Sequence, residues 1–188
     1  MSDELIEQDV ATLSKQLGTK RLSPVELTDA YLNRIDEFDS NLHAYISVTG
    51  DLAREQARAA EAEITRGAYR GPFHGIPIGL KDLCYTKGIR TTAGSRILAD
   101  FFPDHDSTAW TRLRDAGAIL LGELNLHEFA YGLSSTNPHW GSVRNPYDRS
   151  RIPGGSSGGS SAAIVAGMAA ATIGTDTGGS IRIPAALC

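Results

Sequence analysis

Cysteine is scarce in this 188-residue chain, which holds only Cys84 and Cys188. Two cysteines cannot supply the disulfide framework of a small secreted protein, so we expect a protein of the reducing cytoplasm. The opening residues 1–4 are acidic and are followed by no apolar signal core. A run of small residues at 162–173 is too short and too weakly apolar to span a bilayer. The sequence therefore predicts a cytoplasmic location and no membrane partner.

The chain also lacks an excess of basic residues. Its 18 Lys and Arg residues are outnumbered by 22 Asp and Glu residues, which gives a formal net charge of −4. Proteins that bind nucleic acid directly usually carry a basic patch or stripe, and none is evident here. The hydrophobic fraction of 41% is ordinary for a soluble globular protein. We therefore expect no direct nucleic-acid partner.

Motifs for metals and phosphates are incomplete. A P-loop needs a lysine directly after its glycines, and no lysine follows Lys87. His127 and Glu128 form half of a zinc-protease motif, but Tyr131 stands where the second histidine should be. Residues 104–106 read Asp-His-Asp, yet neighbours on one turn rarely converge on one ion, so a solvated loop is the simpler interpretation. The sequence predicts neither a metal nor a cofactor.

A turn that carries a hydroxyl group is present near the end of the chain. Residues 174–185 read GTDTGGSIRIPA and follow the small, apolar run 169–173. A strand that ends in such a turn can present the Ser180 hydroxyl beside backbone N–H groups. Acyl transfer needs that combination, because it requires a nucleophile and donors for the developing oxyanion. Ser180 is the candidate nucleophile, although by itself it could also cap a helix.

Two further polar residues stand in marked surroundings. Ser156 lies within the glycine- and serine-rich run 153–161, and Lys81 closes the apolar run 75–80. Taken alone, the first run could be a flexible linker and Lys81 a solvated charge at a strand end. A linker should lead into a new composition, whereas a small-residue helix follows at once. The three residues considered together favour one shared site.

The nucleophile needs a base, because a serine hydroxyl is barely ionised at neutral pH. None of the histidines, at positions 43, 74, 105, 127 and 139, lies in a motif that pairs it with Ser180. A lysine can act as a base when burial lowers its pKa and leaves it neutral. The apolar residues before Lys81 favour such burial. The Ser156 hydroxyl could then pass a proton between Ser180 and Lys81, since it both accepts and donates.

The motifs around Lys81, Ser156 and Ser180 resemble those of the amidase signature family, whose members hydrolyse amides with a Ser-Ser-Lys triad. The likeness runs from about Leu13 to the last residue. It includes further blocks in the family's order, at residues 88–95, 116–125 and 128–132. The resemblance implies that Lys81, Ser156 and Ser180 are the catalytic residues and that Ser156 follows a cis peptide bond.

The resemblance also implies the surroundings of the triad. The oxyanion hole would be formed by backbone N–H groups of Thr177, Gly178, Gly179 and Ser180. Tyr131 and Gly132 would line the substrate pocket. The glycines at 154, 155, 158 and 159 would make the unusual backbone path feasible. We further expect Asp176 to hydrogen-bond the loop backbone and Arg182 to be a structural ion-pair partner.

The periodicity predicts an alternation of helices and strands. We expect helices over residues 7–18, 23–38, 51–66, 107–115 and 159–167, and strands over 43–48, 76–81, 118–124 and 169–175. This order predicts an α/β fold, and the resemblance implies an amidase-signature-like mixed sheet flanked by helices. No internal boundary is visible, so residues 1–188 are expected to be the N-terminal part of a single amidase signature domain. Family members are more than twice as long, so we expect a chain truncated at its C-terminus.

Three functions are compatible with this resemblance. The first is a stand-alone amidase that cleaves a small-molecule amide through an acyl-enzyme. The second is the A subunit of a glutamyl-tRNA(Gln) amidotransferase, which releases ammonia from glutamine for a partner subunit. The third is a catalytically impaired fragment. Either a homo-oligomer or partner subunits would be consistent with the sequence.

Overall fold

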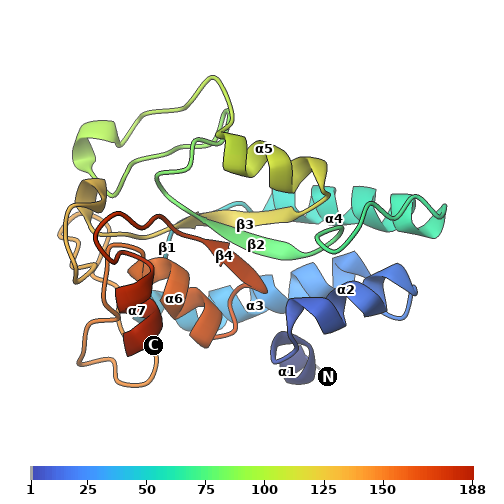
Figure 1. The fold of residues 1–188 in the computed structure, drawn as a ribbon, viewed down its shortest axis with the longest axis horizontal. Coiled ribbons are helices and arrows are strands. Elements are labelled where there is room, and N and C mark those ends of the chain that lie inside the picture. Colours follow the sequence, from blue (N-terminus) through green and yellow to red (C-terminus); the bar gives the residue numbers. More distant parts are fainter. Residues whose placement is uncertain (1) are drawn as a thin grey trace.

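The computed structural model describes the backbone of residues 2–188 and the side chains of residues 4–188. Its strands form a central sheet with helices on both sides (Figure 1). The strands are β1 (Tyr45–Val48), β2 (Pro77–Lys81), β3 (Ile119–Leu124) and β4 (Ala171–Ile173). The helices are α1 (Ser2–Ile6), α2 (Val10–Gly18), α3 (Pro24–Leu42), α4 (Gly50–Thr65), α5 (Thr108–Asp115), α6 (Gly158–Val165) and α7 (Arg182–Leu187), with 3-10 turns η1 (Arg96–Leu98) and η2 (Glu128–Ala130). The predicted α/β fold is confirmed.

The sheet is mixed, as the resemblance implied. Its strand order is β1-β3-β2-β4, with β1 antiparallel to β3 and with β2 parallel to both β3 and β4. Leu80 lies opposite Ile173, and Lys81 lies opposite Leu124. Because parallel strands end at the same edge of a sheet, the end of β2 and the loop after β4 must meet. This edge is where the candidate site lies.

Helix α3 shows how local sequence sets an element. Ser23 is its N-cap, and the Ser23 Oγ accepts hydrogen bonds from the N–H groups of Val25 and Glu26. The predicted end near residue 38 is too early, because the helix continues to Leu42. It stops where His43 adopts a left-handed conformation with a φ of 53°. Histidine in that position gives no strong stop signal in a sequence.

The core lies between the sheet and the helices that cover it. In Figure 1, α2, α3 and α6 lie on one side of the strands and α5 on the other. Every residue of β2 and β3 is buried, as the continuous apolar runs predicted. Wholly buried members of this core include Leu13, Leu17, Leu27, Ile78, Leu80, Ile119, Leu120 and Leu124. Each such side chain contributes about 1.5–3 kcal/mol of hydrophobic stabilisation.

Strand β4 differs from the predicted strand 169–175. Its small, apolar composition is that of a central strand, but it extends only over Ala171–Ile173 and lies at the edge of the sheet. Its residues are only partly buried, because within residues 2–188 no strand pairs with its second side. The short strand still serves the site, since it delivers the loop that contains Ser180.

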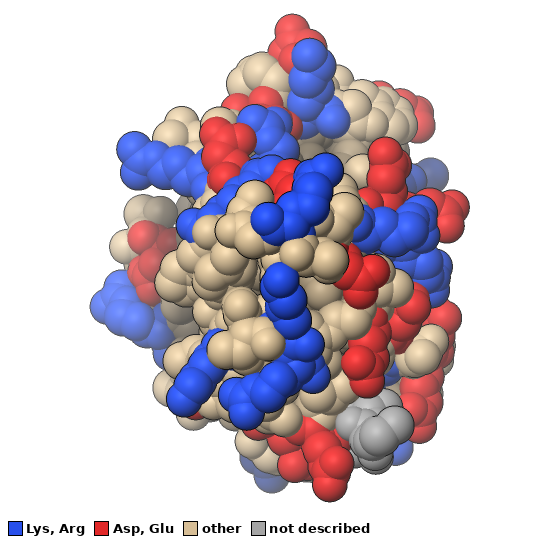
Figure 2. All heavy atoms as spheres, turned by 90° about the vertical axis from the view of Figure 1, so that its right-hand side faces the viewer, with Lys and Arg blue, Asp and Glu red and all other residues tan. Residues whose placement is uncertain are grey.

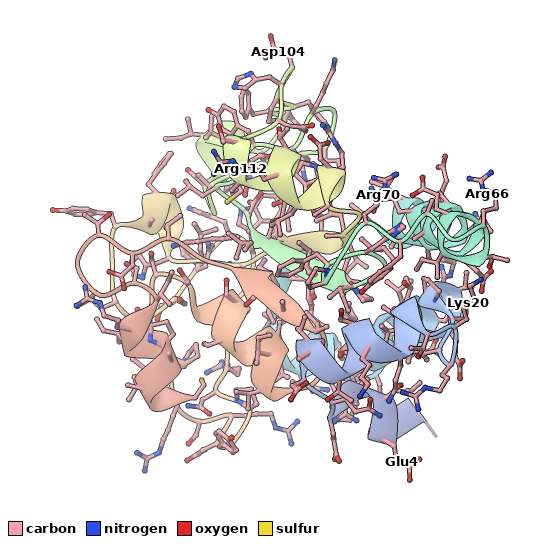
Figure 3. The ribbon with its side chains drawn as sticks, turned by 45° about the vertical axis from the view of Figure 1, so that its right-hand side comes forward. Glu4, Lys20, Arg66, Arg70, Asp104 and Arg112 are labelled. Atoms are coloured by element: carbon pink, nitrogen blue, oxygen red, sulfur yellow. The ribbon has the colours of Figure 1, made fainter. Side chains whose placement is uncertain are left out.

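Charged side chains are numerous at the end of the molecule where α2 and α4 lie. Figure 2 shows that face, where basic and acidic residues are intermixed. Lys20, Arg66 and Arg70 project there from the turn after α2 and from the segment that follows α4 (Figure 3). Arg70 is paired with Glu63 at 2.6 Å. No helix among residues 2–188 combines the length and apolar character that crossing a bilayer requires.

Candidate active site

Lys81 ends β2, and its side chain is wholly buried, as predicted. Its Nζ donates hydrogen bonds to three hydroxyl oxygens, namely Ser156 Oγ at 2.7 Å, Ser157 Oγ at 2.9 Å and Thr175 Oγ1 at 2.8 Å. Burial lowers the pKa of the Lys81 ammonium to about 8, while nearby Cys84 and Asp176 raise it in part. A pKa near neutrality suits a general base.

Ser156 sits on a tightly packed backbone. The peptide bond between Gly155 and Ser156 is cis, as the resemblance implied. The Ser156 carbonyl accepts hydrogen bonds from the His127 N–H at 3.1 Å and from the Ser135 hydroxyl at 3.3 Å. The Ser156 side chain is wholly buried, and its Oγ accepts from Lys81. These contacts hold the Ser156 hydroxyl against the Lys81 Nζ.

The glycines around Ser156 serve two different purposes. Gly154 has a φ of 87°, so it needs the backbone freedom that was predicted for the whole run. The other three glycines are required by close packing instead. A Cβ on Gly155 would lie 2.8 Å from the Ser135 nitrogen, and a Cβ on Gly158 or Gly159 would overlap neighbouring atoms. The prediction of backbone freedom therefore holds only for Gly154.

Ser180 lies in the loop between β4 and α7 and is 7% exposed. Its carbonyl accepts a hydrogen bond from the Ser157 N–H at 3.1 Å, which holds it beside Ser156. Among the described side chains, no hydrogen bond joins the hydroxyls of Ser156 and Ser180. The structure thus contains the hydrogen bond between Lys81 and Ser156 and places Ser180 beside Ser156. The hydrogen bond between the two serine hydroxyls is not formed.

Asp176 organises the Ser180 loop. Its Oδ1 accepts from the Gly179 N–H at 2.8 Å, and its Oδ2 accepts from the N–H groups of Ile181 at 3.0 Å and Arg182 at 3.1 Å. The Arg182 guanidinium pairs with the carboxylate at 2.9 Å. This hydrogen bond is the main reason that the pKa of Asp176 lies well below its usual range. The predicted roles of Asp176 and Arg182 are confirmed.

The same contacts restrict the candidate oxyanion donors. The Gly179 N–H is directed at Asp176, so in this conformation it is not free for a substrate. Within the described residues, the N–H groups of Thr177, Gly178 and Ser180 have no hydrogen-bond partner. Three of the four predicted donors are therefore unpaired among the described residues, and their part in an oxyanion hole remains a prediction.

The segment with Tyr131 and Gly132 lies along the backbone of Ser156. Leu133 and Ser135 pack so closely on Gly155 that a Cβ there would be within 2.9 Å of both. Gly132 rests on the His127 ring. The Tyr131 side chain is 90% exposed. The segment is near the candidate nucleophile, and its role toward a substrate remains a prediction.

Several residues of the site had no separate prediction. Ser157 and Thr175 each bind the lysine nitrogen, and Ser157 Oγ also donates to the Thr175 carbonyl at 3.2 Å. Ser135 bridges the Ser156 carbonyl and the Gly158 N–H. Ser157 and Thr175 stood beside predicted residues, which was a usable signal. Ser135 had none, because only the fold brings it to the Ser156 loop.

The chain matches a known protein family in sequence and solved amidases in structure. Residues 26–188 match the family described as Amidase. The native peptide amidase from Stenotrophomonas maltophilia superposes with a TM-score of 0.91 at 43% identity, over 96% of this chain and 38% of that one. The fold is thus that of an amide-hydrolysing enzyme class, and the chain belongs to the Amidase family.

Several relatives that are similar in sequence are subunits of one enzyme. The chain is 49% identical over 185 residues to the A subunit of glutamyl-tRNA(Gln) amidotransferase from Trichlorobacter lovleyi and 50% identical to that from a Geobacter species. Each alignment covers 98% of this chain and 38% of the relative. The corresponding crystal structure from Thermotoga maritima superposes with a TM-score of 0.79 at 35% identity, over 98% of this chain and 37% of that one. The chain therefore spans well under half the length of these relatives.

Proposed function

We propose that this chain carries the reaction centre of an amide hydrolase that works through an acyl-enzyme on Ser180. The observation that carries the proposal is the Lys81 Nζ, which is buried among three hydroxyls with a pKa near 8. Among the described side chains, no carboxylate forms an ion pair with the Lys81 Nζ. A buried lysine that contacts a serine hydroxyl in this way is arranged as a base rather than as half of an ion pair. Membership of the Amidase family supports the same reaction class.

The proposed reaction begins with neutral Lys81. It takes the proton of Ser156 as Ser156 takes the proton of Ser180, and the Ser180 oxygen bonds to the amide carbonyl carbon. The N–H groups of Thr177, Gly178 and Ser180 stabilise the oxyanion. The C–N bond then breaks, and the proton held by Lys81 passes through Ser156 to the leaving amine. Water attacks the acyl-enzyme by the same proton route, which releases the acid and restores Ser180.

One step needs movement, because the Ser156 and Ser180 hydroxyls are not yet hydrogen-bonded. Substrate binding would close that link, and catalytic hydrogen bonds are often loose before substrate arrives. Residues 1–188 would act within a single amidase domain. No metal or cofactor enters the proposed route.

A second function is favoured by several relatives near 50% identity, which are A subunits of the amidotransferase. In that case the amide would be glutamine, and the ammonia would pass to a partner subunit. The same triad would perform the cleavage. The two functions differ in whether glutamine turnover depends on a partner.

Acyl-enzyme formation can be trapped with hydroxylamine in the native full-length protein. We expect hydroxamate to appear at the expense of the free acid while ammonia release stays at least as fast, because both products come from one acyl-Ser180. The Ser180→Ala variant should form neither product. Acid without any hydroxamate would contradict the acyl-enzyme. Glutamine as the one good substrate, and only beside a partner protein, would favour the second function.

The acylation rate should depend on pH through Lys81. The active base is the neutral amine, whose pKa is lowered to about 8. The rate should therefore fall about tenfold per pH unit below 8 and level off above it. Stopped-flow measurement of acylation between pH 5 and 10 checks this profile. An optimum in acid, or a rate that does not vary from pH 6 to 9, would contradict a lysine base.

A further inference from the structure

The proposed reaction makes no use of Asp82, although this residue directly follows Lys81 and is wholly buried. Its N–H donates to the Leu124 carbonyl at 2.9 Å, which continues the pairing between β2 and β3. Its carboxylate accepts from the Thr92 N–H at 3.0 Å and from the Thr92 hydroxyl. Burying a carboxylate costs free energy that hydrogen-bond donors offset, and the donors here come from Thr92.

Thr92 opens a turn that needs support. Its Oγ1 also accepts a hydrogen bond from the Gly94 N–H at 3.0 Å. Ala93 has a φ of 51° and Gly94 a φ of 69°. Alanine seldom adopts the left-handed region, so its conformation persists only where neighbours enforce it. Thr92 donates hydrogen bonds to Asp82 and accepts one from the Gly94 N–H, so the turn is held on both sides.

The same turn also holds the segment beside Ser156. The Ala93 carbonyl accepts from the Phe129 N–H at 2.8 Å, and the Gly94 carbonyl accepts from Asn137 Nδ2 at 2.9 Å. Asn137 Nδ2 also donates to the Leu126 carbonyl at 3.2 Å. Phe129 again has a positive φ, of 51°. Both ends of the segment between residues 126 and 137 are therefore tied to the turn.

Within this segment, residues 129–133 carry exposed apolar side chains and lie next to the proposed reaction centre. Phe129, Tyr131 and Leu133 are 46%, 90% and 57% exposed, which is unusual for three large apolar groups in five residues. The backbone at Leu133 packs against Gly155, immediately before Ser156. A shift of the segment would therefore change how a substrate is seated without removing any atom of the triad.

We propose that Asp82 is a positioning residue whose carboxylate fixes the segment 129–133, through Thr92, Ala93 and Gly94, relative to the base on the preceding residue. This inference rests on the proposed function. Because Lys81 and Asp82 are adjacent, one rigid strand end sets both the base and the substrate-facing segment. The hydrogen bonds from Thr92 to Asp82 affect where the substrate sits. The hydrogen bonds of Lys81 with its three hydroxyls do not involve Asp82 or Thr92.

The test uses a matched pair of variants at Thr92 in the native full-length protein. Thr92→Val keeps the buried shape and removes the hydroxyl, whereas Thr92→Ser keeps the hydroxyl. We expect Thr92→Val to raise KM for an amide substrate by about tenfold or more and Thr92→Ser to stay within about threefold of wild type. Labelling of Ser180 by a small fluorophosphonate should change less than about threefold in either variant, with the same pH midpoint. Hydrogen exchange at 129–133 should quicken in Thr92→Val alone.

A loss that affects labelling and turnover equally, with KM unchanged, would overturn the inference, and so would unchanged exchange at 129–133. Should Thr92→Val fail to fold, Asp82→Asn provides the second variant, since it retains the shape and one acceptor oxygen. It should quicken exchange at 129–133, and wild-type exchange there would also overturn the inference. Failure of the proposed function would look different, because wild-type Ser180 would not be labelled. The exchange measurement needs no substrate and would still decide the link.

Discussion

Replacing Lys81 with methionine should reduce acylation of Ser180 by on the order of 10⁴-fold. Methionine fills the buried space of the lysine stem but has no amine to accept the Ser156 proton. The loss should be in the chemical step, because within the described part of the chain the Lys81 Nζ hydrogen-bonds the hydroxyls of Ser156, Ser157 and Thr175 alone. The measurement is the second-order rate of fluorophosphonate labelling, together with kcat/KM for an amide.

The chain provides two controls for this change. Lys87→Met removes an exposed lysine six positions further along and should leave the labelling rate unchanged. His127→Gln tests a histidine whose backbone N–H donates to the Ser156 carbonyl. A loss of less than about tenfold in Lys81→Met would contradict a lysine base, as would a comparable collapse in His127→Gln.

Asp176→Ala should lower the acylation rate by about 10²–10³-fold, the range seen when oxyanion donors are lost. The Asp176 carboxylate holds the N–H groups of Gly179, Ile181 and Arg182, so its removal releases the loop on both sides of Ser180. The donors would then no longer be held where charge develops. Single-turnover acylation at pH 9, where Lys81 is mostly neutral, isolates this effect from titration of the base.

Arg182→Gln is the matched control for Asp176. It removes the exposed guanidinium but leaves the carboxylate and its three backbone contacts. We expect the fold reduction in the acylation rate to be less than about one tenth as large in Arg182→Gln as in Asp176→Ala. If Asp176→Ala kept wild-type acylation, the loop would not depend on its carboxylate. If Arg182→Gln were equally damaged, the ion pair rather than the backbone contacts would hold the loop.

Much of the fold follows from sequence patterns that have a direct physical cause. The strands β2 and β3 were predictable because a strand buried on both faces reads as a continuous apolar run. The start of α3 was predictable from Ser23 and Pro24, but its end was not, because it depends on one left-handed histidine. The edge position of β4 depends on which strands pair with it, which composition does not encode.

The site was predictable where chemistry and chain order coincide. Burial of Lys81 followed from its apolar neighbours, and the loop role of Asp176 followed from its place before two glycines. The hydrogen bonds of the Ser157 and Thr175 hydroxyls with the Lys81 Nζ were not predicted, because two segments far apart in the sequence must converge on one nitrogen. The capture of the Gly179 N–H by Asp176 was also beyond the sequence, because it depends on the direction of one peptide group.

The most direct measurement of the central claim is the location of a covalent label. The native full-length protein is treated with a fluorophosphonate, digested, and mapped by mass spectrometry, beside the Ser180→Ala and Ser156→Ala variants. The account predicts label on Ser180 in the wild type, none in Ser180→Ala, and slow labelling still at Ser180 in Ser156→Ala. Label on Ser156 or Ser157, or unchanged labelling of the Ser180→Ala variant, would contradict it.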